Sequence, residues 1–155
     1  MAGEVYHKAW LASGGEFKAR LEQDCIQDLM YRGVLASRDK GGVSGHVARV
    51  LSYFRQQERS QPTQNMMARL YEPILWRQLK VANTEVRLNA CELFLNSYPV
   101  EDRDLTREER DSCLEMQHNC MIKLIRDESV QVRKYFKHKY LCSHVKLLDR
   151  CAARL

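Results

Sequence analysis

Residues 74–79 read Ile-Leu-Trp-Arg-Gln-Leu, and residues 83–87 read Asn-Thr-Glu-Val-Arg. A similar pattern returns 46 positions later, because residues 120–125 read Cys-Met-Ile-Lys-Leu-Ile and residues 129–133 read Ser-Val-Gln-Val-Arg. In both copies an apolar helical segment is followed by a short polar break and a second helical segment. This internal repeat predicts a structural unit made of two antiparallel helices.

A period of about 40 to 47 residues with two helices per unit is typical of HEAT and armadillo solenoids. An ordinary helical bundle could also contain one such pair of similar segments, and it is the alternative architecture. We expect an all-α fold, specifically a HEAT-like α-solenoid of antiparallel helix pairs. Alternating β-branched runs bounded by hairpin turns, the usual signal of strands, are absent from the sequence.

The Val-Arg pair near the start of each second helix gives the repeat four candidate structural residues. We expect Val86 and Val132 to point into the core between the two helices of their unit. The adjacent Arg87 and Arg133 should lie beside the turn between the helices. There a guanidinium can bond backbone carbonyl groups or an acidic residue of the neighbouring repeat.

The same helical spacing continues on both sides of the repeat. On the N-terminal side, an apolar stripe at four-residue spacing predicts a helix over 15–32, and we expect all of its members to share one face: Phe17, Leu21, Cys25 and Leu29, with Ile26 and Met30 beside them. Three helix pairs are expected, stacked in one direction, namely 15–32 with 45–59, 66–81 with 84–97, and 106–126 with 129–141. Thr106 and Glu109 have the spacing of a capping box.

Composition limits the class of protein. The chain has 155 residues, of which 45% are hydrophobic and 29% charged, as in a globular domain. It contains no apolar run near the roughly 20 residues that a membrane span needs. Its first residues lack the features of a secretory signal peptide. Its six cysteines are therefore expected to be free thiols that pack as small apolar side chains.

The positive charge is concentrated at the C-terminal end. The net charge is +5, and residues 134–155 carry six Lys and Arg against one Asp, which leaves residues 1–133 neutral. We divide the chain into a HEAT-like segment, 1–133, and a basic tail, 134–155, which could be partly helical. The tail offers four candidate nucleic-acid contacts, Lys134, Lys137, Lys139 and Lys146. A solvated basic helix face is the other interpretation of these lysines.

The sequence offers no coherent catalytic or cofactor-binding constellation. Cys113, His118 and Cys120 are metal-capable types, but their spacing matches no usual zinc module. The glycine-rich segment 41–46 lacks the Lys-Ser/Thr of a phosphate-binding loop. Ser44 and His46 have no third residue to orient them. We therefore expect a protein that is not an enzyme, with no catalytic, cofactor-binding or metal-binding residues and no small-molecule substrate.

Four short stretches of sequence carry a resemblance to a known family, in addition to the helical repeat. They are Gln-Asp-Cys-Ile-Gln-Asp at 23–28, Val-Leu-Ser-Tyr-Phe at 50–54, Leu-Tyr-Glu-Pro-Ile-Leu-Trp-Arg at 70–77 and Asn-Thr-Glu-Val-Arg-Leu-Asn-Ala at 83–90. With these stretches, residues 4–133 resemble the HEAT-repeat G-type non-SMC subunit of condensin II. The resemblance implies a regulatory subunit that binds a kleisin and SMC subunits, contacts DNA and acts in mitotic chromosome condensation in the nucleus.

The sequence departs from this family after Arg133. The position equivalent to Ala90 is Phe136, and the positions equivalent to Leu93 and Phe94 are Lys139 and Tyr140. We expect these changes to interrupt the inward apolar stripe of the third unit, as in a truncated or alternatively spliced product. The function that we expect is that of a non-catalytic HEAT-repeat scaffold subunit. The alternatives are a helical protein that binds nucleic acid through its basic tail, or a truncated product without function.

Overall fold

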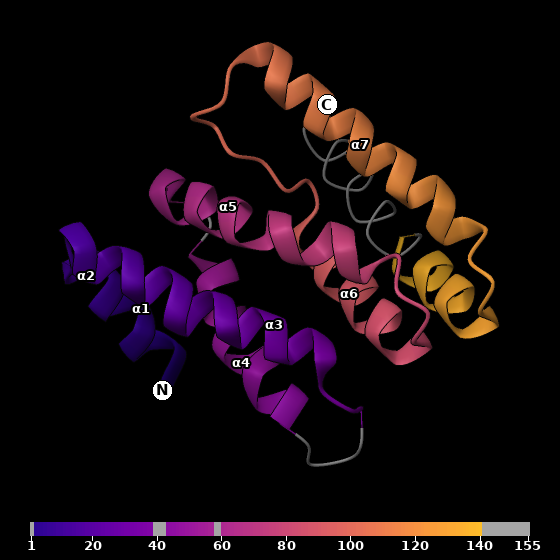
Figure 1. Cartoon of the computed structure of the whole chain (residues 1–155), viewed down its shortest axis with the longest axis horizontal. Helices are drawn as coiled ribbons and strands as arrows, with labels where there is room; N and C mark the ends of the chain where they lie inside the picture. The colour runs from indigo at the N-terminus through magenta and orange to yellow at the C-terminus, as the bar shows by residue number, and fades with distance from the viewer. Residues whose placement is uncertain (1, 39–42, 58–59, 141–155) are drawn as a thin grey trace, which may run out of the picture.

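The computed structural model describes residues 2–38, 43–57 and 60–140, and these residues form helices and turns with no β-strand. The expected all-α class is confirmed. Figure 1 shows the helices following one another across the molecule, from the N-terminal group through α5 and α6 to α7. Among the helices of the described residues, none has the length and apolar composition that a membrane span requires.

The N-terminal part contains two long helical segments and one helix that the sequence pattern did not predict. The unpredicted helix is α1 (Ala2–Ala12). A continuous helical rod follows, made of α2 (Gly15–Arg20), the π-helical segment η1 (Leu21–Gln27) and α3 (Asp28–Leu35). The next helix, α4 (Val43–Gln56), packs against both α1 and α3. The expected pair 15–32 with 45–59 is therefore present, with α1 added.

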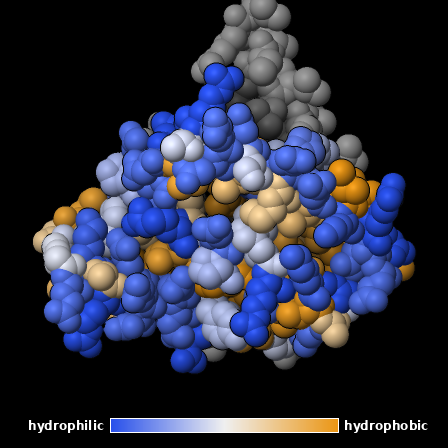
Figure 2. Space-filling view, turned by 45° about the horizontal axis from the view of Figure 1, so that its top comes forward, coloured by the Kyte–Doolittle hydropathy of each residue, from blue (hydrophilic) through white to orange (hydrophobic). Residues whose placement is uncertain are grey.

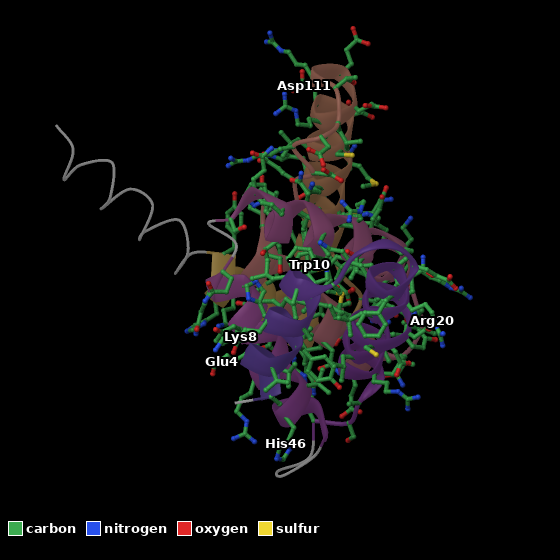
Figure 3. The ribbon with its side chains drawn as sticks, turned by 90° about the vertical axis from the view of Figure 1, so that its left-hand side faces the viewer. Glu4, Lys8, Trp10, Arg20, His46 and Asp111 are labelled. Carbon is green, nitrogen blue, oxygen red and sulfur yellow. The ribbon has the colours of Figure 1, made fainter. Side chains whose placement is uncertain are left out.

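Helix α1 can approach α4 closely because Gly3 has no side chain. A Cβ atom at Gly3 would lie only 2.7 Å from the carbonyl oxygen of Val50 and from Cβ of Tyr53. The buried residues of α1 are Gly3, His7 and Trp10. Figure 3 shows Trp10 within the helical assembly, whereas Glu4 and Lys8 lie at its outer edge.

The C-terminal half follows the predicted repeat. It comprises α5 (Gln61–Gln78), α6 (Thr84–Ser97), α7 (Arg107–Ile125) and a final helix over 130–140. The Asn83 side chain caps α6 by accepting hydrogen bonds from the backbone N–H groups of Glu85 and Val86. Thr106 and Glu109 form the expected capping box at the start of α7.

The apolar stripe predicted for the first helix is wrong at its N-terminal end. Phe17 is 68% exposed, whereas Ile26 and Met30 are fully buried. Steps of four residues overshoot one α-helical turn by about 40°, so a long stripe at that spacing drifts around the helix. The π-helical turns of η1 shift the phase further, because a π-helix has more residues per turn.

The third unit is packed more completely than the sequence predicts. The sequence predicts that Phe136 interrupts the inward stripe, but its side chain is 1% exposed and belongs to the same core cluster as Val132 and Leu124. Its ring stacks on Tyr140 at a centroid distance of 5.3 Å. Lys139 is only partly buried. The helix over 130–140 also crosses the expected domain boundary after residue 133.

One apolar cluster runs through the helices and holds most of the large buried side chains, including Trp10, Phe54, Tyr71, Phe94 and Phe136. On the face drawn in Figure 2, hydrophilic residues surround apolar patches near the centre. Three large apolar side chains near the C-terminal end of the described residues, Ile122, Ile125 and Val130, are between 44% and 51% exposed.

Candidate functional site

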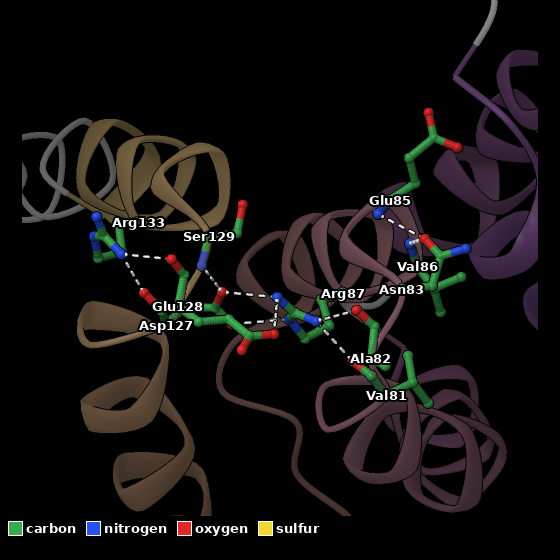
Figure 4. A network of polar contacts seen from close by, with 10 residues as sticks. All are labelled: Val81, Ala82, Asn83, Glu85, Val86, Arg87, Asp127, Glu128, Ser129 and Arg133. Carbon is green, nitrogen blue, oxygen red and sulfur yellow. Dashed lines mark hydrogen bonds and ion pairs between the residues drawn. The ribbon is translucent and has the colours of Figure 1, made fainter.

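In the two repeated units, the turn between the helices is held by an arginine. Arg87 Nη1 donates hydrogen bonds to the carbonyl oxygens of Val81 and Ala82 at 2.8 and 2.7 Å. Arg133 Nη1 donates to the carbonyl oxygens of Asp127 and Glu128 in the second copy. In both units the accepting carbonyls lie five and six residues before the arginine (Figure 4). The 46-residue repeat is therefore visible at the level of single hydrogen bonds.

Arg87 also links its unit to the next one. Its Nε and Nη2 donate to the two carboxylate oxygens of Asp127 at 3.0 and 3.1 Å, and its guanidinium lies 3.0 Å from Glu128 (Figure 4). The side chains of Arg87 and Asp127 are 5% and 9% exposed. Hydrogen bonding to Asp127 is the main cause that raises the pKa of Arg87. Val86 and Val132, which precede the two arginines, are both buried.

A second polar cluster connects the first unit with the two that follow. Arg38 donates to Oδ1 of Asn89 and Oε2 of Glu92, both at 2.6 Å, and lies 5.5 Å from the centroid of the Tyr135 ring. The Asn89 amide nitrogen donates to the carbonyl oxygens of Val34 and Ala36 at 2.9 Å. These donors satisfy carbonyl groups at the end of α3.

A groove of about 260 Å³ lies between α5, the segment over 98–105 and α7. We call it the apolar groove, because six largely apolar side chains form much of its wall: Ala68, Trp76, Val100, Leu105, Cys113 and Met116. Charged residues line it as well: Arg69, Glu72, Glu101, Asp102 and Arg110. The Trp76 Nε1 and Arg110 Nε atoms are buried and have no hydrogen-bond partner among the described residues. Both residues line the groove, so two donors beside it lack the partner that buried polar groups usually have.

Two buried polar side chains fix the segment over 98–105. Gln117, in α7, accepts a hydrogen bond from the Val100 N–H at 3.0 Å and donates one to the Val100 carbonyl at 2.8 Å. Asn65, in α5, accepts one from the Arg103 N–H at 3.0 Å. In the sequence, Gln117 differs from its neighbours only as a polar residue at an apolar position of the helical pattern. Its near-complete burial, 1% exposed, follows from these two bonds.

The structure places three of the four candidate nucleic-acid lysines. Lys134 and Lys137 are exposed and three residues apart on the helix over 130–140, so they share one face. Lys139 is partly buried and lies on a different side of the helix. Lys146 lies outside the described residues. The expected basic contact surface is thus represented here by two lysines, with exposed His138 beside them.

The described residues contain no group of three or more His, Cys, Asp and Glu side chains that could hold a metal ion. Cys25, Cys91, Cys113 and Cys120 are free. Cys91 is fully buried, and burial raises its pKa to about 12, so it is a thiol rather than a nucleophilic thiolate near neutral pH. Cys142 and Cys151 lie outside the described residues.

The chain matches the model of a protein family described as the condensin II non structural maintenance of chromosomes subunit, over residues 1–102. It is 42% identical over 130 residues to condensin-2 complex subunit G2 of Mus musculus and 38% identical over 130 residues to that of Xenopus laevis. The subunit G2 of Homo sapiens is 40% identical over 131 residues.

These alignments cover 84% of this chain but only 11% of each of the three relatives. No solved structure matches the chain. The family match covers well over half of the chain. The alignments with the three relatives are longer than this match. The chain therefore belongs to the family of condensin II non-SMC subunits.

Proposed function

We propose that this chain is a non-catalytic scaffold, a HEAT-like solenoid segment of a condensin II subunit that acts in mitotic chromosome condensation in the nucleus. The observation that carries the solenoid is the shared geometry of Arg87 and Arg133 in units 46 residues apart. The Arg87 contact with Asp127 then joins one unit to the next, as neighbour contacts do in repeat proteins.

The partner surface that we propose is the apolar groove, and its occupant is a segment of the kleisin subunit. Kleisin and SMC subunits are the partners that the family implies. The groove combines apolar walls with the unpartnered Trp76 Nε1 and Arg110 Nε donors. An extended peptide supplies both complements, because its side chains fill an apolar groove and its backbone carbonyls accept hydrogen bonds.

Co-purification of the whole chain with the kleisin and SMC subunits tests this proposal. Met116→Lys places a charge in the apolar groove and should abolish co-purification. Ile122→Lys is the matched control, because Ile122 lies in the same helix, is 47% exposed and does not line that groove. Unchanged binding of the Met116→Lys chain, with a native circular dichroism spectrum, would refute the groove as the kleisin surface.

Nucleic-acid binding through the C-terminal basic residues is the second candidate function. Exposure of Lys134 and Lys137 on one helix face favours it. Deleting residues 134–155 would be a poor test, because that deletion removes the buried ring of Phe136. A Lys134→Gln, Lys137→Gln double variant keeps the core. For each lysine removed, the slope of the logarithm of the DNA-binding constant against the logarithm of the salt concentration should become shallower by about one. Lys80→Gln, also exposed, serves as the control.

A further inference from the structure

A second depression, of about 650 Å³, lies between the ends of α4 and α6 and the segment over 98–105. We call it the polar hollow. Its lining is made of two arginines, three side-chain amides and three other residues: Arg55, Arg103, Gln56, Gln64, Asn96, and Ser97, Tyr98 and Pro99. No Asp or Glu lies among the described residues that line it. Its charge is therefore positive, and almost all of its polar groups can donate hydrogen bonds.

The two arginines come from distant parts of the sequence and have no counter-ion among the residues that the structure describes. Neither guanidinium forms an ion pair or a hydrogen bond with the described residues, whereas Arg38 and Arg87 are both paired with carboxylates. The backbone of Arg103 is fixed by its hydrogen bond to Asn65. Two unpaired guanidinium groups beside one hollow provide the planar donor sets that bind phosphate oxygens.

Ser97 adds an unused hydroxyl group to this surface. The residue is only 9% exposed, and its Oγ is buried without a hydrogen-bond partner among the described residues. Rotation of the Ser97 side chain toward an oxygen in the hollow would break no existing hydrogen bond. Ser97 is the last residue of α6, and the carbonyl end of a helix disfavours an anion. That field is weaker than the attraction of two guanidinium groups, each of which can form charged hydrogen bonds with phosphate.

We propose that the polar hollow binds a phosphorylated serine or threonine of a partner protein, held by Arg55 and Arg103. A single phosphate suits two arginines in one depression. A DNA backbone presents a row of phosphates, and it is bound by many basic groups with a net positive field. The body of this chain over residues 1–133 is neutral, which favours the phosphopeptide. This site shares no side chain with the apolar groove, so the proposal does not depend on the kleisin assignment.

The test is a titration of the full 155-residue chain, followed by NMR signals of the arginine side chains and the Ser97 amide. The probe is N-acetyl-O-phosphoserine N-methylamide, and the unphosphorylated compound is its control. We expect saturable shifts with the phosphorylated probe alone, at a dissociation constant on the order of 1 mM. Arg55→Gln and Arg103→Gln should each weaken binding by about fivefold or more. Arg77→Gln, an exposed arginine outside the hollow, should leave it unchanged.

Several results would overturn the proposal. They are an absence of shifts, equal binding of the two probes, or binding that neither substitution in the hollow weakens. Short duplex DNA that shifts the same signals at lower concentration, and loses this effect in both variants, would assign the hollow to nucleic acid instead. Should Arg55→Gln fail to fold, Arg103→Gln decides the question, because the Arg103 side chain is exposed.

Discussion

Arg87 and Asp127 lie 40 positions apart in the sequence and form a two-point ion pair in the interior of the molecule. The Asp127 carboxylate also accepts a hydrogen bond from the Ser129 N–H at 2.8 Å, at the start of the last described helix. One carboxylate therefore contributes both to the contact between units and to the turn inside its own unit.

Arg87→Ala should destabilise the chain strongly. The change removes the turn contacts and leaves the Asp127 carboxylate, 9% exposed, without its cation. Loss of one partner of a buried ion pair costs about 3 to 5 kcal/mol. Arg133→Ala is the matched control, because Arg133 has the same turn contacts but is half-buried, and it should cost about 1 to 2 kcal/mol. Urea unfolding followed by circular dichroism gives both values, and equal costs would contradict the ranking.

Phe136→Ala should show that the last helix belongs to the core. Removing a ring that is 1% exposed leaves a cavity and costs about 3 to 5 kcal/mol. Phe17→Ala makes the same chemical change at a position that is 68% exposed, and its cost should stay within about 0.5 kcal/mol. Thermal melts of the two variants are the measurement. A harmless Phe136→Ala would mean that residues 130–140 do not pack as described.

Gln117→Ala should loosen the segment over 98–105. It removes both hydrogen bonds to the Val100 backbone, so the Val100 amide should exchange its hydrogen faster. Gln131→Ala, at an exposed position in the last helix, provides the comparison. Hydrogen–deuterium exchange read by NMR resolves the Val100 amide. Unchanged exchange in Gln117→Ala would show that other contacts hold the segment.

The buried His7 should make stability depend on pH. Burial lowers its pKa below the usual value of 6.5, and its Nε2 lies 3.2 Å from the Thr63 hydroxyl. The unfolded chain therefore binds a proton more readily than the folded chain. The free energy of unfolding should fall as the pH drops through 6.5 toward the lower folded pKa. His7→Gln should reduce this dependence, whereas His118→Gln, at an exposed position, should not. Urea unfolding at several pH values decides between them.

The sequence patterns predicted structural features that depend on contacts between residues close together in the chain. The Val-Arg repeat predicted the positions of Arg87 and Arg133, and the Thr106 to Glu109 spacing predicted the cap of α7. Helix α1 was not predicted, because its buried face consists of Gly3, His7 and Trp10, and two of these are not apolar types.

Residues that act over long distances were harder to predict. Phe136 occupies the position in its unit that Ala90 occupies in the preceding one, yet the last unit buries its ring. Equivalent positions in the repeat therefore did not predict how much space each unit offers a side chain. The polar hollow joins Arg55 with Arg103 through the packing of three elements. The apolar groove depends in the same way on the Gln117 contacts that hold its wall. No spacing in the sequence signals either arrangement.

The two sets of Arg87 contacts also separate two stages of folding. Its bonds to the Val81 and Ala82 carbonyls close a loop of six residues or fewer and can form as soon as α5 and α6 meet. Its pair with Asp127 must wait until the next unit docks. Loss of the carbonyl bonds alone would slow folding of the α5 and α6 hairpin. Asp127→Asn would mainly speed unfolding if docking follows the rate-limiting step. A single side chain can thus report the order in which the units assemble.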